Sequence, residues 1–304
     1  MAASAEAPLP TPRVRVPRLL RRLHSLAQLL RLDRPIGIWL LLWPTLWALW
    51  VAAGGHPSRR LLLIFAAGTV VMRSAGCIVN DLADRNIDPH VRRTRARPLA
   101  ARVVSPYEAL ALFGVLLLVA LWLALQLNAL SIELACVGAV LTVTYPLLKR
   151  FFPLPQLYLG LCFGWGVPMA FAATLGQVPR EGWLMLVAAV LWAGVYDTEY
   201  AIVDRDDDLR VGLQSTAILF GDLDRLIIGA MQCMVLFALV LLGRTLQFDR
   251  WYYGGLAAGA ALFLWQQWLI RHRDRAGCFA AFLNNGYFGV AVFIGILLEF
   301  ATER

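Results

Sequence analysis

Apolar segments long enough to cross a lipid bilayer fill most of this 304-residue chain. A helix needs about 20 consecutive apolar residues to span the hydrocarbon core of a membrane. With 60% hydrophobic and 16% charged residues, the composition is too apolar for an ordinary soluble domain. The sequence therefore predicts an all-α integral membrane protein with nine transmembrane helices, near residues 36–54, 61–80, 107–127, 129–147, 156–176, 182–202, 224–243, 252–270 and 282–300.

Positive charge is concentrated on one side of the predicted helices. The formal net charge is +8, but the arginines stand at the edges of apolar segments and not on a soluble face, so no nucleic-acid partner is expected. If the N-terminus is cytoplasmic, most of the basic residues fall on the cytoplasmic side, as the positive-inside rule requires. We therefore expect a bacterial inner (cytoplasmic) membrane protein with a cytoplasmic N-terminus. The alternative is the mitochondrial inner membrane, because residues 1–33 are rich in Ala, Pro and Arg and hold a single acid.

The first 35 residues are expected to form a cytoplasmic arm. Leu19, Leu23, Leu26 and Leu30 recur at helical spacing, and arginines occupy the other face. This pattern is typical of an amphipathic helix that lies on a membrane surface, with lipid as its partner. Residues 36–304 contain no linker and are expected to form a single membrane domain, for which the sequence implies no obligate protein partner.

Two clusters of acids interrupt the apolar pattern. Asn80, Asp84 and Asp88 are spaced by four residues, which places them along one helix face. An aspartate within or at the edge of a membrane costs about 2.5 to 3.5 kcal/mol, so several together require a compensating ligand.

The second cluster repeats this arrangement. Asp197, Asp204 and Asp208 lie at i, i+7 and i+11, again on one face, and Tyr200 follows Asp197 by about one turn. Both clusters contain a DxxxD spacing, and both lie at the cytoplasmic ends of apolar helices.

Carboxylate and amide oxygens are hard ligands that suit Mg²⁺, which typically joins one or two carboxylates to the phosphate oxygens of a substrate. Two such clusters facing each other would hold a diphosphate between them, with Lys149 and nearby arginines taking the remaining charge. The five cysteines and four histidines show no spacing typical of a zinc site. The alternative is that both clusters are solvated helix ends held by neighbouring arginines, as charge runs often are.

Five stretches together resemble the UbiA family of intramembrane aromatic prenyltransferases. They are "RLDRPIGIWLLLWPTLWALW" (31–50), "NDLADRNID" (80–88), "RTRARPL" (93–99), "YDTEYAIVDRDDD" (196–208) and "LQSTAILFG" (213–221). The similarity extends from about Arg31 to Gly289, and it is most specific for the branch of the family that acts on 4-hydroxybenzoate.

The resemblance implies a fold of nine transmembrane helices around a central cavity, with Mg²⁺-bound diphosphate at the cytoplasmic end. The substrates it implies are polyprenyl diphosphate and 4-hydroxybenzoate. By position in the motifs, it assigns one set of metal and diphosphate ligands to Asn80, Asp84 and Asp88, and the other to Asp204 and Asp208. It also assigns diphosphate or substrate contacts to Arg85, Tyr145 and Lys149. The family often has Gln where this chain has Glu199.

Arg73 is a basic residue deep inside a predicted span, seven residues before Asn80 and so on nearly the same helix face. We expect its guanidinium to hold the carboxylate of 4-hydroxybenzoate. The alternative is a buried ion pair with Glu133 or Glu199.

Three further residues complete the expected site. Asp197, which lies deeper than the metal-binding acids, is the candidate for orienting or deprotonating the phenol. Tyr200 is expected to contact substrate from the same helix. Arg34 stands in a matched stretch and is expected to contact substrate, with an interaction with lipid headgroups as the alternative.

These expectations describe transfer of a polyprenyl group to the ring carbon ortho to the hydroxyl of 4-hydroxybenzoate, with release of diphosphate, in ubiquinone biosynthesis. One alternative keeps the family and changes the acceptor to a naphthoate, homogentisate or haem. The other is a cation-coupled transporter that uses the acids as ion sites.

Overall fold

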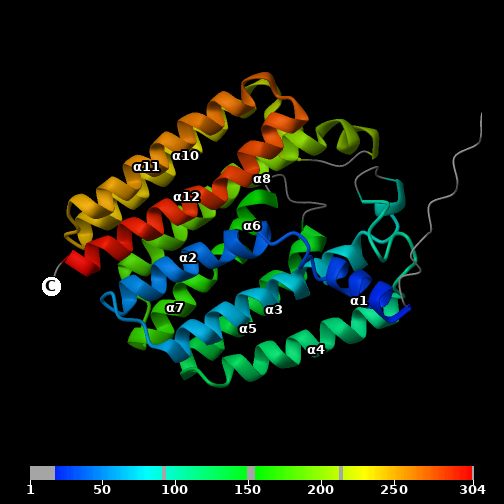
Figure 1. Cartoon of the computed structure of the whole chain (residues 1–304), viewed down its shortest axis with the longest axis horizontal. Helices are drawn as coiled ribbons and strands as arrows, with labels where there is room; N and C mark the ends of the chain where they lie inside the picture. Colours follow the sequence, from blue (N-terminus) through cyan, green and yellow to red (C-terminus); the bar gives the residue numbers. More distant parts are fainter. Residues whose placement is uncertain (1–17, 91–93, 149–154, 212–214, 303–304) are drawn as a thin grey trace, which may run out of the picture.

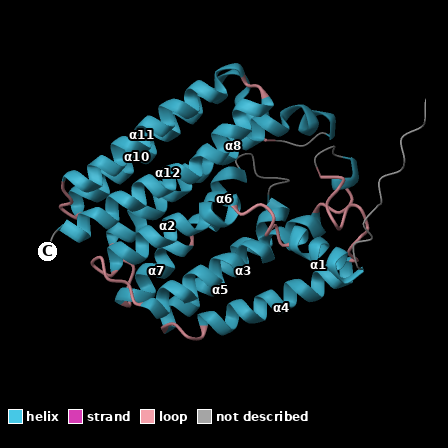
Figure 2. Ribbon diagram, viewed as in Figure 1, coloured by secondary structure: helices cyan, strands magenta, loops and turns pink. Residues whose placement is uncertain are grey.

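The computed structural model describes residues 18–90, 94–148, 155–211 and 215–302, and all regular structure in these ranges is helical (Figure 2). The longer helices are α1 (Arg18–Leu29), α2 (Ile36–Ala52), α3 (Arg59–Ala83), α4 (Pro106–Ala124), α5 (Ala129–Leu148), α6 (Pro155–Gly164), α7 (Gly166–Leu175), α8 (Arg180–Val211), α10 (Asp224–Thr245), α11 (Arg250–Leu269) and α12 (Arg275–Thr302). Shorter ones are α9 (Thr216–Phe220), η1 (Asp88–His90), η2 (Gly221–Leu223) and η3 (Ile270–His272).

Each of the nine predicted spans coincides with one of these helices, or with the consecutive pair α6 and α7. Within the described ranges, seven helical segments are long and apolar enough to cross a membrane. The apolar helix α2 is shorter, at 17 residues. Helix α11 runs along α12 (Figure 1). The prediction of an all-helical membrane protein is confirmed, and the number of nine spans holds approximately.

The predicted span at 156–176 is divided at Trp165, where α6 ends and α7 begins. Gly164 and Gly166 flank this break. Close packing of α6 on α8 depends on Gly160, because a Cβ atom there would lie 2.8 Å from the carbonyl oxygen of Val190. The two halves of this span therefore take their positions from contacts of small residues with neighbouring helices.

Helix α8 is longer than the sequence predicted. The predicted span ended near residue 202, but α8 continues to Val211. The span was predicted too short because the polar run after residue 202 does not end the helix. Its acids lie along a continuing helix, where Asp207 is buried and paired with Arg275 of α12 at 3.4 Å.

An aromatic core joins α2, α8 and α12. The indole of Trp47 stacks on Trp192 at 5.3 Å between ring centroids, and Phe288 packs against both rings. The Trp47 indole N–H donates to the carbonyl oxygen of Gly289 at 3.1 Å, so this buried polar group is satisfied. The core fixes α8, which carries the second acidic motif, and α2, which carries most of the matched stretch at 31–50.

Helix α1 is present where the amphipathic pattern predicted it. Leu29 is fully buried against Ile78 and Leu99, whereas Leu19 and Leu23 are more than half exposed. One end of α1 is thus anchored on α3 and the loop that follows it, and the other end presents leucines outward. Its attachment to a membrane surface stays a prediction.

Candidate active site

The first acidic motif spans the end of α3 and the turn after it. Asn80 lies in the last turn of α3, which ends at Ala83, and Asp84 occupies the C-cap position. The backbone N–H of Asp84 donates to the carbonyl oxygen of Asn80, and that of Asp88 donates to the carbonyl oxygen of Asp84, both at 2.9 Å. The expectation that one helix carries Asn80, Asp84 and Asp88 was therefore wrong beyond Ala83, although a turn with the same hydrogen-bond spacing continues the chain.

Asp81 is at the centre of a buried ion cluster. Its two carboxylate oxygens accept hydrogen bonds from Nη2 of Arg31 at 2.9 and 2.8 Å, and one of them also accepts from Nη1 of Arg97 at 3.0 Å. The same Arg97 nitrogen donates to Asp88 at 2.9 Å. Since Asp81 is only 1% exposed, this cluster ties the segment before α2, the end of α3 and the loop after η1 into one unit.

The second acidic motif lies entirely on α8. Asp197, Asp204 and Asp208 keep the one-face arrangement that the sequence predicted, because the helix is continuous from Arg180 to Val211. Asp204 is buried. Asp207 points elsewhere and pairs with Arg275.

Asp224, at the start of α10, anchors this end of α8. It is fully buried and accepts hydrogen bonds from Nε of Arg273 at 2.9 and 3.0 Å, while Arg205 of the motif lies 3.8 Å away. The hydrogen bond that Arg273 donates to Asp224 raises the pKa of Arg273, so the arginine stays charged. Asp224, Arg31 and Arg97 were not among the residues predicted for the site; the sequence signal for Arg97 was its place in "RTRARPL".

Tyr145, near the end of α5, relates the two motifs to each other. It is close enough to interact electrostatically with Asp84 of the first motif, with Asp197 of the second and with Arg73. Helices α2 and α7 each pack against both α3 and α8. The segment after α3, in cyan, and the end of α8, in yellow-green, lie toward the same end of the bundle (Figure 1). One acid of each motif, Asp84 and Asp197, is thus within electrostatic range of Tyr145.

Arg73 lies in the middle of α3. Its guanidinium is 5.5 Å from the ring centroid of Phe163 in α6. Nε is buried and has no hydrogen-bond partner. Among the described residues, neither Glu133 nor Glu199 pairs with it: Glu133 is exposed, and Glu199 accepts a hydrogen bond from Asn285 at 2.7 Å. The alternative of a buried ion pair with these acids is therefore not what the structure contains.

The other residues predicted to contact substrate range from exposed arginines to a tyrosine packed on a neighbouring helix. Arg34 is 70% exposed beside Asp33, and Arg85 is exposed after the end of α3. Tyr200 packs its ring on Phe282 of α12 at 4.8 Å. Lys149 lies outside the described residues.

The residues of the two motifs suit a hard metal ion. All five predicted ligands present oxygen, which is what Mg²⁺ prefers. Within the described ranges, no group of three or more acids, histidines or cysteines is close enough to form a complete metal site by itself.

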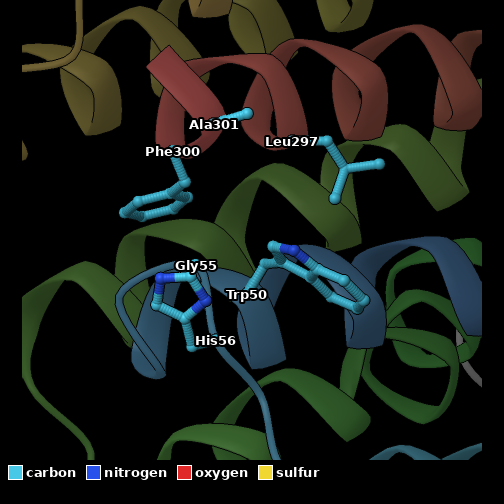
Figure 3. A pocket seen from close by; sticks show the side chains of 6 residues that line it. All are labelled: Trp50, Gly55, His56, Leu297, Phe300 and Ala301. Atoms are coloured by element: carbon cyan, nitrogen blue, oxygen red, sulfur yellow. The ribbon is translucent and has the colours of Figure 1, made fainter. Parts of the chain in front are cut away.

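A pocket of about 290 Å³ lies at the other end of the bundle, between the ends of α2 and α12 (Figure 3). It is lined by Trp50, Gly55, His56, Leu297, Phe300 and Ala301. It contains none of the predicted site residues.

Fold and site together define a polytopic helical membrane protein with two acidic motifs gathered at one end of its bundle. The chain belongs to the UbiA prenyltransferase family, whose model matches residues 41–293.

Relatives support this membership over nearly the whole chain. The chain is 57% identical over 273 residues to a 4-hydroxybenzoate octaprenyltransferase of Coxiella burnetii, covering 90% of this chain and 95% of the relative. It is 54% identical over 278 residues to a protein of the same description from Alkalilimnicola ehrlichii, covering 91% and 95%.

Solved structures share the fold. A UbiA homologue from Aeropyrum pernix K1 aligns with a TM-score of 0.74 and 27% identity, over 86% of this chain and 97% of that one. A UbiA homologue from Archaeoglobus fulgidus, bound to GPP and Mg²⁺, aligns with a TM-score of 0.68 and 16% identity, over 90% and 99%.

Proposed function

We propose that the protein transfers a polyprenyl group from polyprenyl diphosphate to the ring carbon ortho to the hydroxyl of 4-hydroxybenzoate, releasing diphosphate, in ubiquinone biosynthesis. The observation that carries this proposal is the 57% identity to a 4-hydroxybenzoate octaprenyltransferase over 95% of that protein's length. Because the relatives are bacterial, we place the reaction at the bacterial inner membrane. The distribution of arginines supports a cytoplasmic N-terminus and a cytoplasmic acidic end.

The two acidic motifs are proposed to bind the diphosphate. Asn80, Asp84 and Asp88 would hold Mg²⁺ on one side, and Asp204 and Asp208 on the other. Bound there, Mg²⁺ would supply positive charge against the diphosphate as it departs. The fold supports this role because the ends of α3 and α8 lie toward the same end of the bundle, and because Asp84 and Asp197 are both within electrostatic range of Tyr145.

Arg85, Tyr145 and Lys149 are proposed to bind the remaining phosphate oxygens, with Arg34 at the entrance. Arg34 and Arg85 are exposed, so each can turn toward an incoming anion. The prenyl tail would lie among apolar side chains within the membrane, which exclude water from the allylic centre.

Arg73 is proposed to hold the carboxylate of 4-hydroxybenzoate. It is a charge within a membrane span that has no ion-pair partner among the described residues, and its Nε is buried without a hydrogen bond. A bound carboxylate would satisfy that donor and compensate the charge.

The chemical step is an electrophilic substitution. The bond between the allylic carbon and the diphosphate oxygen breaks, the ring carbon ortho to the hydroxyl bonds to that allylic carbon, and the ring proton leaves. Asp197 is proposed to orient the phenol or accept its proton, and Tyr200 to contact substrate from the next turn of α8. The proximity of Asp197 and Arg73 to Tyr145 supports placing both ends of the acceptor in this region.

Membranes containing the protein should test the proposal directly. They are incubated with Mg²⁺, polyprenyl diphosphates and a panel of aromatic acids, and products are identified by mass. The proposal predicts a prenylated 4-hydroxybenzoate and one equivalent of diphosphate. Product with a naphthoate or homogentisate, and none with 4-hydroxybenzoate, would refute it.

A further inference from the structure

Gly37, in the first turn of α2, lies directly against the guanidinium of Arg73. A Cβ atom built on Gly37 would be 2.6 Å from Nη2 and 2.9 Å from Cζ of Arg73, and closer still to Nε. Ordinary contacts of a Cβ atom are 3.4 Å or more. The guanidinium therefore occupies the space that any side chain at position 37 would fill.

The guanidinium is also limited on another side. Phe163 of α6 places its ring centroid 5.5 Å from Cζ of Arg73, within the range of a cation–π interaction. Gly37 is buried, and Nε of Arg73 is buried as well, so this part of the guanidinium lies between α2 and α6. Contacts from two helices thus define where the arginine of a third helix can place its donors.

We propose that Gly37 is a positioning residue that sets the place of the Arg73 guanidinium and thereby makes the site selective for an acceptor with a carboxylate. This inference rests on the proposed function, since it names a residue that controls recognition of the aromatic acid. Gly37 touches no substrate and acts through Arg73. The ring of Phe163, 5.5 Å from Cζ of Arg73, supports the same placement from α6.

Substitution of Gly37 by Ala should leave the fold intact. The group in the way is the flexible end of a long side chain, which can move aside. Alanine also favours a helix interior by about 1 kcal/mol relative to glycine. The added methyl group should therefore displace the charge without unfolding the protein.

The expected effect is selective for one substrate. Displacement of a binding group by about 1 Å can cost about 100-fold in rate. We expect Gly37→Ala to raise KM for 4-hydroxybenzoate by about 10- to 100-fold, and to leave KM for polyprenyl diphosphate within about twofold. Gly68→Ala is the matched control, because Gly68 lies in α3 and a Cβ there meets nothing within 4 Å. It should leave both constants unchanged.

A second background separates positioning from a general structural effect. Lysine in place of Arg73 lacks the planar fork that lies against Gly37, so Gly37→Ala should add a much smaller penalty in Arg73→Lys than in the wild type. 4-Hydroxybenzamide has no carboxylate for Arg73 to bind. With this acceptor, Gly37→Ala and the wild type should transfer the prenyl group at the same rate.

The outcomes are distinguishable. An equal rise in both KM values, or an equal penalty in the wild type and in Arg73→Lys, would overturn the role of Gly37 while the proposed function stands. A wild-type protein that prenylates no aromatic acid would overturn the proposed function, and the inference with it.

Discussion

Replacement of Asp81 by Asn should destabilise the protein more than any comparable change at an exposed acid. Removing one partner of a buried ion pair typically costs about 3–5 kcal/mol. Here the side chains of Arg31 and Arg97 keep 18% and 17% exposure, and Arg97 retains Asp88 at 2.9 Å. Water and the second carboxylate offset part of the loss, so we expect about 2–3 kcal/mol.

Equilibrium unfolding in mixed micelles measures this cost. Asp206→Asn provides a matched control, because Asp206 is 72% exposed and lies 3.6 Å from Arg275. An exposed pair contributes at most about 1 kcal/mol. The Asp81→Asn, Arg31→Gln double variant should lose less than the sum of the single changes by about 1 kcal/mol or more, because one interaction is removed twice. Equal losses for Asp81→Asn and Asp206→Asn, or strict additivity with Arg31→Gln, would refute the ion cluster.

Further predictions concern the buried acid of α8 and the metal. Glu199→Gln should leave the free energy of unfolding within about 0.5 kcal/mol of the wild type, because an amide keeps the acceptor for Asn285 and removes a carboxyl whose second oxygen has no partner. Glu199→Ala removes that acceptor and should cost about 1–3 kcal/mol. Unfolding curves of both variants check this. Chelation of divalent ions should abolish prenyl transfer, and added Mg²⁺ should restore it, as measured by product mass; transfer that persists in excess chelator contradicts the metal assignment.

The sequence predicted the helices well because span length is a local property. A run of about 20 apolar residues has few alternatives in a membrane, so each predicted segment matched a helix. The end of α8 was not predictable in the same way. The apolar run ends near residue 202, and the pairing of Asp207 with Arg275 shows why the helix continues beyond it.

Site residues that share one helix were predictable from the sequence, and contacts between separate elements were not. The face shared by Asp197, Asp204 and Asp208 follows from helix periodicity, and the structure keeps it. The partnership of Asp81 with Arg97, by contrast, spans a loop that has no periodicity, and the contact of Gly37 with Arg73 joins two helices. Contacts of this kind depend on how separate elements pack together, and the spacing of residues in the sequence does not predict them.

We propose that one diphosphate is held jointly by both acidic motifs. Calorimetric titration of the purified protein with inorganic diphosphate in the presence of Mg²⁺ tests it most directly, with Asp84→Asn and Asp204→Asn as single variants from opposite motifs. We predict one diphosphate bound per chain in the wild type and at least a tenfold loss of affinity, about 1.4 kcal/mol, in each variant. Wild-type affinity in either variant would contradict the shared site.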